Sequence, residues 1–119
     1  MEYPSLEEAK YYTREMDFEN RLTVLSQGFH RGITYVRCYS LEQFVYAIGK
    51  REFNNPAGGV RTLDFDELYS WIKDKIGDEI LANAVQKICR DCDDIMEAID
   101  VLRVVVYIRM NQYKEVMAT

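Results

Sequence analysis

Apolar residues recur at helical spacing from the start of this 119-residue chain. The spacing begins at Leu6, behind a capping box that Ser5 and Glu8 can form. It continues to Gly28 through apolar residues that return every two to four positions: Ala9, Tyr12, Met16, Phe18, Leu22 and Leu25. This pattern predicts one long helix or two abutting helices over residues 6–27.

The rhythm changes after Gly32, where the stretch "ITYVRCY" is rich in β-branched and aromatic residues. It predicts a strand over 33–39. A second short strand is predicted at 60–63, in "GVRTL", and the two would form a minor two-stranded β element. A helix is expected after each strand, the first from Leu41 to about Glu52 and the second behind a cap. The caps are Ser40 with Gln43 and Asp64 with Glu67.

From residue 78 onward one apolar stripe runs along the rest of the chain at about 100° per residue. Its members share one side of a helix: Leu81, Ala84, Val85, Ile88, Cys92, Ile95, Ile99, Leu102, Val106, Met110, Tyr113 and Met117. A single helix over 79–117 would be roughly 58 Å long, more than the ~35 Å expected across a compact chain of this size. We therefore expect two helices, 79–92 and 94–117, with Asp94 capping the second. One long dimerising helix is the alternative.

These elements predict a mainly α fold, a compact bundle of about five helices with the minor β element, in a single domain over 1–119. Residues 101–108 are apolar all round, because Val101, Val104, Val105 and Ile108 occupy the side that is polar elsewhere. Such a segment packs on two sides if it is helical, and a buried strand is the alternative. These four residues are therefore the predicted interaction surface.

Composition and charge limit the kinds of partner and the cellular compartment that are expected. The net charge is −5, yet residues 28–62 carry five basic side chains against two acidic ones. Those basic residues are the candidate anion contacts for a nucleic acid, a partner that the acidic total disfavours: Arg31, Arg37, Lys50, Arg51 and Arg61. No apolar run approaches the ~20 residues of a membrane span, so a cytoplasmic protein without a membrane partner is expected. Three cysteines, an odd number, favour reduced thiols.

Two constellations suggest chemistry. Cys38, Cys89, Cys92 and His30 contain the donors of a tetrahedral zinc site, but the Cys89–Cys92 pair lies within the predicted helix rather than on a turn. A redox pair would instead need Cys89 at a helix N-terminus. Burial of the thiols as small apolar groups is the favoured interpretation.

The second constellation is acidic. Asp93, Glu97 and Asp100 share a helix face with spacing suited to a metal-bound phosphate. A catalytic site of this kind needs a second acidic pair, and Asp64 with Glu67 is already explained as a helix cap. Solvated carboxylates are favoured, so neither a metal nor another cofactor is predicted.

The favoured function is a small non-enzymatic interaction or regulatory module that binds another protein, or itself as a homo-oligomer, through apolar helix surface. A nucleic-acid-associated regulator that uses the basic 28–62 segment is the first alternative. A metal-dependent enzyme with helix carboxylates is the second.

Overall fold

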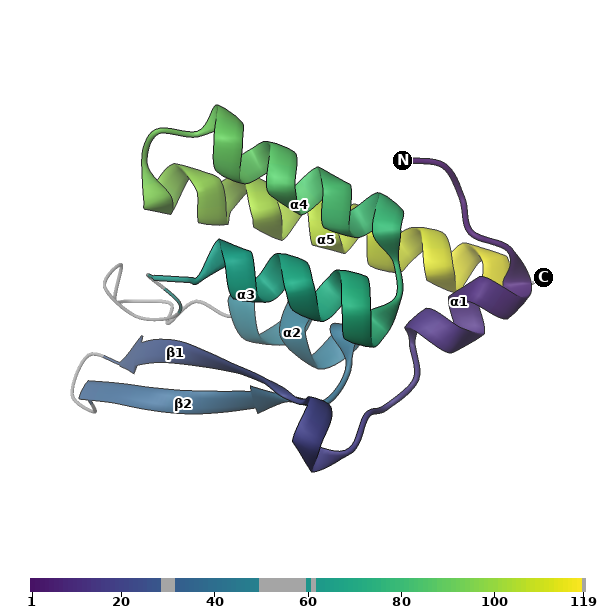
Figure 1. The fold of residues 1–119 in the computed structure, drawn as a ribbon, viewed down its shortest axis with the longest axis horizontal. Coiled ribbons are helices and arrows are strands. Elements are labelled where there is room, and N and C mark those ends of the chain that lie inside the picture. The colour runs from purple at the N-terminus through teal and green to yellow at the C-terminus, as the bar shows by residue number, and fades with distance from the viewer. Residues whose placement is uncertain (29–31, 50–59, 61, 119) are drawn as a thin grey trace.

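The computed structural model describes residues 1–28, 32–49, 60 and 62–118. In this part of the chain the fold is mainly helical with one two-stranded antiparallel sheet, which confirms the predicted class (Figure 1). The elements follow in the order α1 (Leu6–Tyr12), η1 (Phe18–Asn20), β1 (Leu22–Gly28), β2 (Gly32–Cys38), α2 (Leu41–Gly49), α3 (Phe65–Ser70), η2 (Trp71–Ile76), α4 (Glu79–Asp91) and α5 (Ile95–Met117).

The first helix begins as predicted but ends early. The Ser5 hydroxyl accepts a hydrogen bond from the Glu8 N–H at 3.1 Å, and the Glu8 carboxylate accepts one from the Ser5 N–H at 2.9 Å. Helix α1 then stops at Tyr12, and β1 occupies a stretch for which helix was predicted. That prediction was wrong because Leu22 and Val24 also fit the alternation of a half-buried strand, and both are buried.

The strand predicted at 33–39 is present as β2, but its predicted pairing partner is not. Strand β2 covers 32–38 and pairs with β1, with Leu22 opposite Cys38 and Val24 opposite Val36. Residues 60, 62 and 63 belong to no strand, so the predicted partner at 60–63 was wrong. Pairing with β1 costs less loop-closure entropy, because only three residues separate the two strands.

The C-terminal half forms the predicted helical hairpin. Helix α4 ends at Asp91 and α5 begins at Ile95, which confirms two helices rather than one. Asp94 caps α5 through the N–H of Met96 at 3.3 Å. Helix α3 continues directly into the π-helical turn η2, and Gly77 ends that turn with a φ of 97°. The left-handed conformation explains the glycine at this position.

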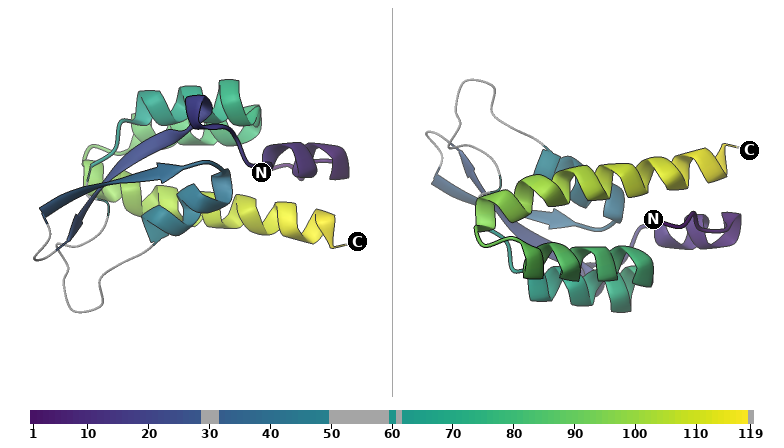
Figure 2. Two further views of the ribbon diagram at one scale, coloured as in Figure 1. Left: turned by 90° about the horizontal axis from the view of Figure 1, so that it is seen from below. Right: turned by 90° about the horizontal axis from the view of Figure 1, so that it is seen from above.

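The core lies between the helices and one face of the β-ribbon. Leu22, Val24 and Cys38 of the ribbon are buried there with the inward residues of α2, α3, α4 and α5. The Trp71 ring packs against Phe44, and its indole N–H donates to the Asn20 carbonyl at 2.8 Å. Figure 2 shows α5 running along the molecule beside α4, with α1 near the C-terminal end of α5. No helix in the described residues is both long and apolar enough to cross a membrane.

One cluster of polar side chains is buried between α4 and α5. Arg109 is 0% exposed and makes a bidentate ion pair with Asp78, through Nε to Oδ2 at 2.8 Å and Nη2 to Oδ1 at 3.0 Å. The Tyr113 hydroxyl donates to the same carboxylate, and Asp78 caps α4 through the Leu81 N–H at 3.1 Å. Asp78 therefore links the start of α4 to the middle of α5.

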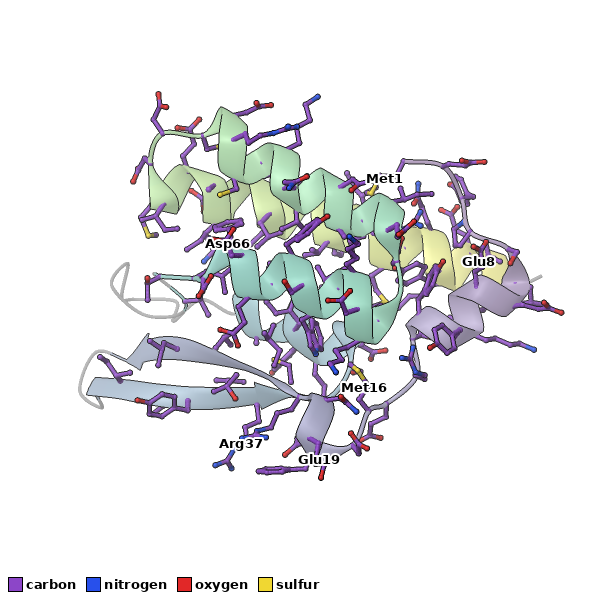
Figure 3. All side chains as sticks on the ribbon, viewed as in Figure 1. Met1, Glu8, Met16, Glu19, Arg37 and Asp66 are labelled. Carbon is purple, nitrogen blue, oxygen red and sulfur yellow. The ribbon has the colours of Figure 1, made fainter. Side chains whose placement is uncertain are left out.

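The N-terminal segment completes this cluster. The third donor of the guanidinium, Nη1, reaches the Glu2 carbonyl at 2.5 Å and the Gln112 side-chain oxygen at 2.8 Å. The Gln112 amide donates to the Met1 carbonyl at 2.9 Å. Figure 3 labels Met1 close to these helices. Gln112 is not a member of the predicted apolar stripe, but it is buried beside the N-terminal segment.

Charge and burial oppose each other at Arg109. Burial alone would lower the pKa of its guanidinium, but the hydrogen bond and the charge of Asp78 outweigh burial and raise the pKa. Burial first, and the Asp78 charge second, also raise the pKa of the Tyr113 phenol. At neutral pH Arg109 is therefore charged and Tyr113 is a hydrogen-bond donor.

Removing one partner of this pair is expected to leave a buried charge without compensation. Asp78→Ala should lower the free energy of unfolding by about 3–5 kcal/mol, measured by urea denaturation. The double variant Asp78→Ala with Arg109→Met should cost less than the sum of the two single variants, because the orphan charge is gone.

Asp64→Ala is the matched control. Asp64 caps α3 through the Glu67 N–H at 3.0 Å, the same kind of bond that Asp78 makes. Asp64 is exposed, however, and no arginine within the described residues pairs with it. Loss of a cap alone should cost about 1 kcal/mol. Equal costs for Asp64→Ala and Asp78→Ala would contradict a role for the ion pair.

Candidate protein-interaction surface

The outward face of α5 carries a contiguous set of exposed apolar side chains. Val101 is 39% exposed, Val104 58%, Tyr107 61% and Ile108 46%. Val105, the fourth residue of the predicted set, is half-buried and packs against the core. Tyr107 was absent from that set, although its spacing of three from Val104 places the two on neighbouring turns. We call Val101, Val104, Tyr107 and Ile108 the α5 patch.

The other sides of α5 are occupied. Helices α1, α2 and α4 all pack against it, and its inward residues are buried: Ala98, Ile99, Leu102, Val106, Arg109, Met110, Gln112 and Tyr113. At 100° per residue these inward residues centre on the direction opposite Val104. The outward apolar side of residues 101–108 is therefore not covered by α1.

Charged residues flank the α5 patch at both ends. Glu97 and Asp100 are exposed on the turns before it, and Lys114 is exposed after it. Asp100, Tyr107 and Lys114 follow one another at intervals of seven residues and so share one side of the helix. Arg103 lies beside the α5 patch, where Nη1 binds Asp100 at 2.5 Å and Nε donates to the Ile48 carbonyl at 2.5 Å. From its N-terminal to its C-terminal end, the outward face of α5 therefore carries acidic side chains, then the α5 patch, then the basic side chain of Lys114.

The predicted anion contacts are described only at one position. Arg37 is exposed on β2, opposite Thr23 of β1. Arg31, Lys50, Arg51 and Arg61 lie outside the described residues. Binding of a nucleic acid by this set stays a prediction.

The three thiols lie at two places in the fold, Cys38 on the ribbon and Cys89 with Cys92 at the end of α4. Cys38 is buried at the end of β2, whereas Cys89 is exposed on the last turn of α4 and Cys92 is half-buried at its C-cap. Burial raises the pKa of Cys38 to about 11. Burial, and then the charges of Glu97 and Asp91, raise the pKa of Cys92. His30 lies outside the described residues.

The predicted carboxylates are exposed. Asp93 precedes the cap of α5, and Glu97 and Asp100 stand on its first two turns. The Asp100 carboxylate forms an ion pair with Arg103. Within the part of the chain that the structure describes, no three metal-binding side chains gather in a geometry that could hold an ion.

Comparison of the chain with protein-family models, with curated proteins and with solved structures finds no match. The class of this protein is therefore defined by its fold and surfaces alone. It is a small mainly α protein with a β-ribbon, a buried Asp–Arg cluster and an apolar patch on its longest helix.

Alkylation rates should follow the positions of the three thiols. With iodoacetamide at pH 8, followed by peptide mass spectrometry, Cys89 should react first, Cys92 more slowly and Cys38 only after unfolding. The reason is that alkylation needs an accessible thiolate, which burial and nearby carboxylates suppress.

The same reaction in concentrated urea is the control, and there the three rates should converge. Rapid alkylation of Cys38 in the native protein would contradict its burial. Protection of Cys89 and Cys92 by added zinc would contradict their separation from a metal site.

Proposed function

We propose that this protein is a non-enzymatic interaction module that self-associates through the α5 patch. The observation that carries the proposal is the exposure of four apolar side chains on adjacent turns of one helix, Val101, Val104, Tyr107 and Ile108. Single exposed apolar residues are common on protein surfaces, but contiguous patches mark sites of association. Association would remove this surface from water, at roughly 25 cal/mol for each Å² of apolar area buried.

A second copy of the chain fits this surface by charge. If two α5 helices pack antiparallel about a two-fold axis at Tyr107, the residue seven positions before it faces the residue seven positions after it in the other copy. Asp100 of each copy then faces Lys114 of the other, and both contacts form at once because the interface is symmetric. A parallel arrangement would instead place Asp100 against Asp100. The charges thus favour the antiparallel dimer.

The size of the surface predicts moderate affinity. Stable interfaces bury about 1,200–2,000 Å² in total, and a single pair of helix faces lies near or below the lower limit. Tyr107 supplies a large aromatic side chain near the centre of the interface, the kind of residue that contributes most to binding. We expect a dissociation constant on the order of 10 µM.

Charge exchange at the two ends tests this dimer. Asp100→Lys alone places like charges opposite each other twice in the dimer, and so does Lys114→Asp alone. Each variant should raise the dimer dissociation constant roughly tenfold in sedimentation equilibrium. An equimolar mixture of the two variants should recover the affinity, because in the mixed dimer each lysine faces an aspartate.

Lys87→Asp is the matched control for Lys114→Asp, with the same change of charge on an exposed residue of α4. It should leave the association unchanged. A wild-type protein that stays monomeric at several hundred micromolar would refute the proposal. So would two charge variants that associate no better mixed than apart.

A further inference from the structure

A groove runs along the free edge of β1, on a part of the molecule separate from the α5 patch. It has a volume of about 430 Å³ and lies between β1 and the segment that leads into α3. Leu22, Thr23, Val24 and Leu25 form one wall, with Tyr35 beside them, and residues 62–64 with Glu67 form the other. In Figure 1 β1 is the strand of the ribbon that faces α3. The groove therefore borders the outer edge of β1 and, at Leu25 and Tyr35, the outward face of the ribbon.

The residues that line the groove show that it gives access to the backbone edge of β1. Successive residues of a strand point to opposite faces, so a cavity that touches four residues in a row follows the backbone edge. The sheet has only the two strands, in the order β1–β2. In the described residues no backbone hydrogen bond joins β1 to 62–64. The N–H and C=O groups on the outer edge of β1 are thus available to another strand.

The sequence of β1 does not protect this edge. Natural edge strands usually carry lysine, proline or an inward charge that prevents pairing with another chain. The strand reads "LTVLSQG" and has no charged residue and no proline. The outward face of the ribbon is apolar where Leu25 lies opposite Tyr35, which is 71% exposed, and polar where Thr23 lies opposite Arg37. Such an edge favours addition of a strand.

Charge selects the partner. Two carboxylates, Asp64 and Glu67, line the wall opposite β1, and both residues are exposed. A second copy of this chain paired edge to edge would bring two such carboxylate pairs together, and each copy already carries a net charge of −5. Like charges across an interface disfavour that dimer. A strand with lysine or arginine at alternate positions places its cations against these acids.

We propose that the groove binds an extended cationic peptide segment of another protein as a third strand, hydrogen-bonded to the edge of β1. Backbone hydrogen bonds would supply the affinity. The lining of the groove, apolar along most of β1 and acidic at Asp64 and Glu67, would supply the sequence preference. This site is independent of self-association through α5.

The test uses the full chain and a fluorescein-labelled octapeptide of alternating lysine and valine, followed by fluorescence anisotropy. Its counterpart is the same peptide N-methylated at every backbone nitrogen, which keeps the charge but has no N–H on either edge to donate to β1. The unmodified peptide should bind, and the N-methylated peptide should bind at least tenfold more weakly. Absence of binding, or equal binding of the two peptides, would overturn the proposal.

A matched pair of variants locates the site. Glu67→Lys reverses a charge in the groove and should raise the dissociation constant of the lysine–valine peptide about five-fold. Asp66→Lys makes the same change one residue earlier, in the same turn of α3 but outside the groove lining, and should have little effect. Equal effects of the two variants would overturn the assignment. So would amide shifts in nuclear magnetic resonance spectra that fall on residues 91–100 instead of β1.

Discussion

The buried ion pair between Asp78 and Arg109 sets the orientation of the longest helix together with the apolar stripe of that helix. Apart from Arg103, residues 101–108 are apolar on both sides of α5, so hydrophobic burial in this segment alone discriminates little between the possible rotations of the helix. The stripe over the whole of α5 favours one rotation, and Arg109 disfavours the others, because a guanidinium buried without a carboxylate partner would cost several kcal/mol. Only one rotation of α5 brings Arg109 to Asp78 at the start of α4. We infer that the pair contributes specificity of packing more than net stability.

This rotation has a consequence on the surface. With Arg109, Met110 and Tyr113 turned inward, Val104, Tyr107 and Ile108 are left facing solvent. One rotation of α5 thus both buries the polar cluster and exposes the proposed interaction surface. The N-terminal segment contributes to the same choice, because its first two carbonyls accept the remaining hydrogen bonds of Arg109 and Gln112. A substitution in the cluster would be expected to alter association without touching the surface.

The two proposed surfaces lie on different layers of the molecule. The ribbon lies on the far side of α3 from the α4–α5 hairpin (Figure 1), and the groove lies between β1 and the start of α3. A dimer formed through α5 would therefore leave both β1 edges open. Two weak peptide sites held together in one dimer would bind a bivalent partner more tightly than either site alone.

Local signals predicted much of this fold, and long-range ones were missed. The capping box at Ser5, the break at Asp94 and the strand at 33–39 are each encoded within a few neighbouring residues, and each is present. The strand at 22–28 was missed because its apolar residues also fit helical spacing, and only pairing with β2 distinguishes the two.

The Asp78–Arg109 pair spans 31 positions, so no window of sequence contains both partners. The available signal was Arg109, within a mostly apolar run that also contains Arg103. Tyr107 was missed for a simpler reason: the predicted surface was restricted to aliphatic residues. Its exposure depends on the rotation of α5, which the apolar stripe and Arg109 set together.

The rotation of α5 is tested most directly by the exchange of the Arg109 Nε proton with solvent, measured in nuclear magnetic resonance spectra of the unmodified protein. Burial and the bond to Asp78 predict exchange far slower than that of Arg90, which is exposed on α4. If the two protons exchange at similar rates, Arg109 is in contact with water, and the orientation of α5 described above is wrong.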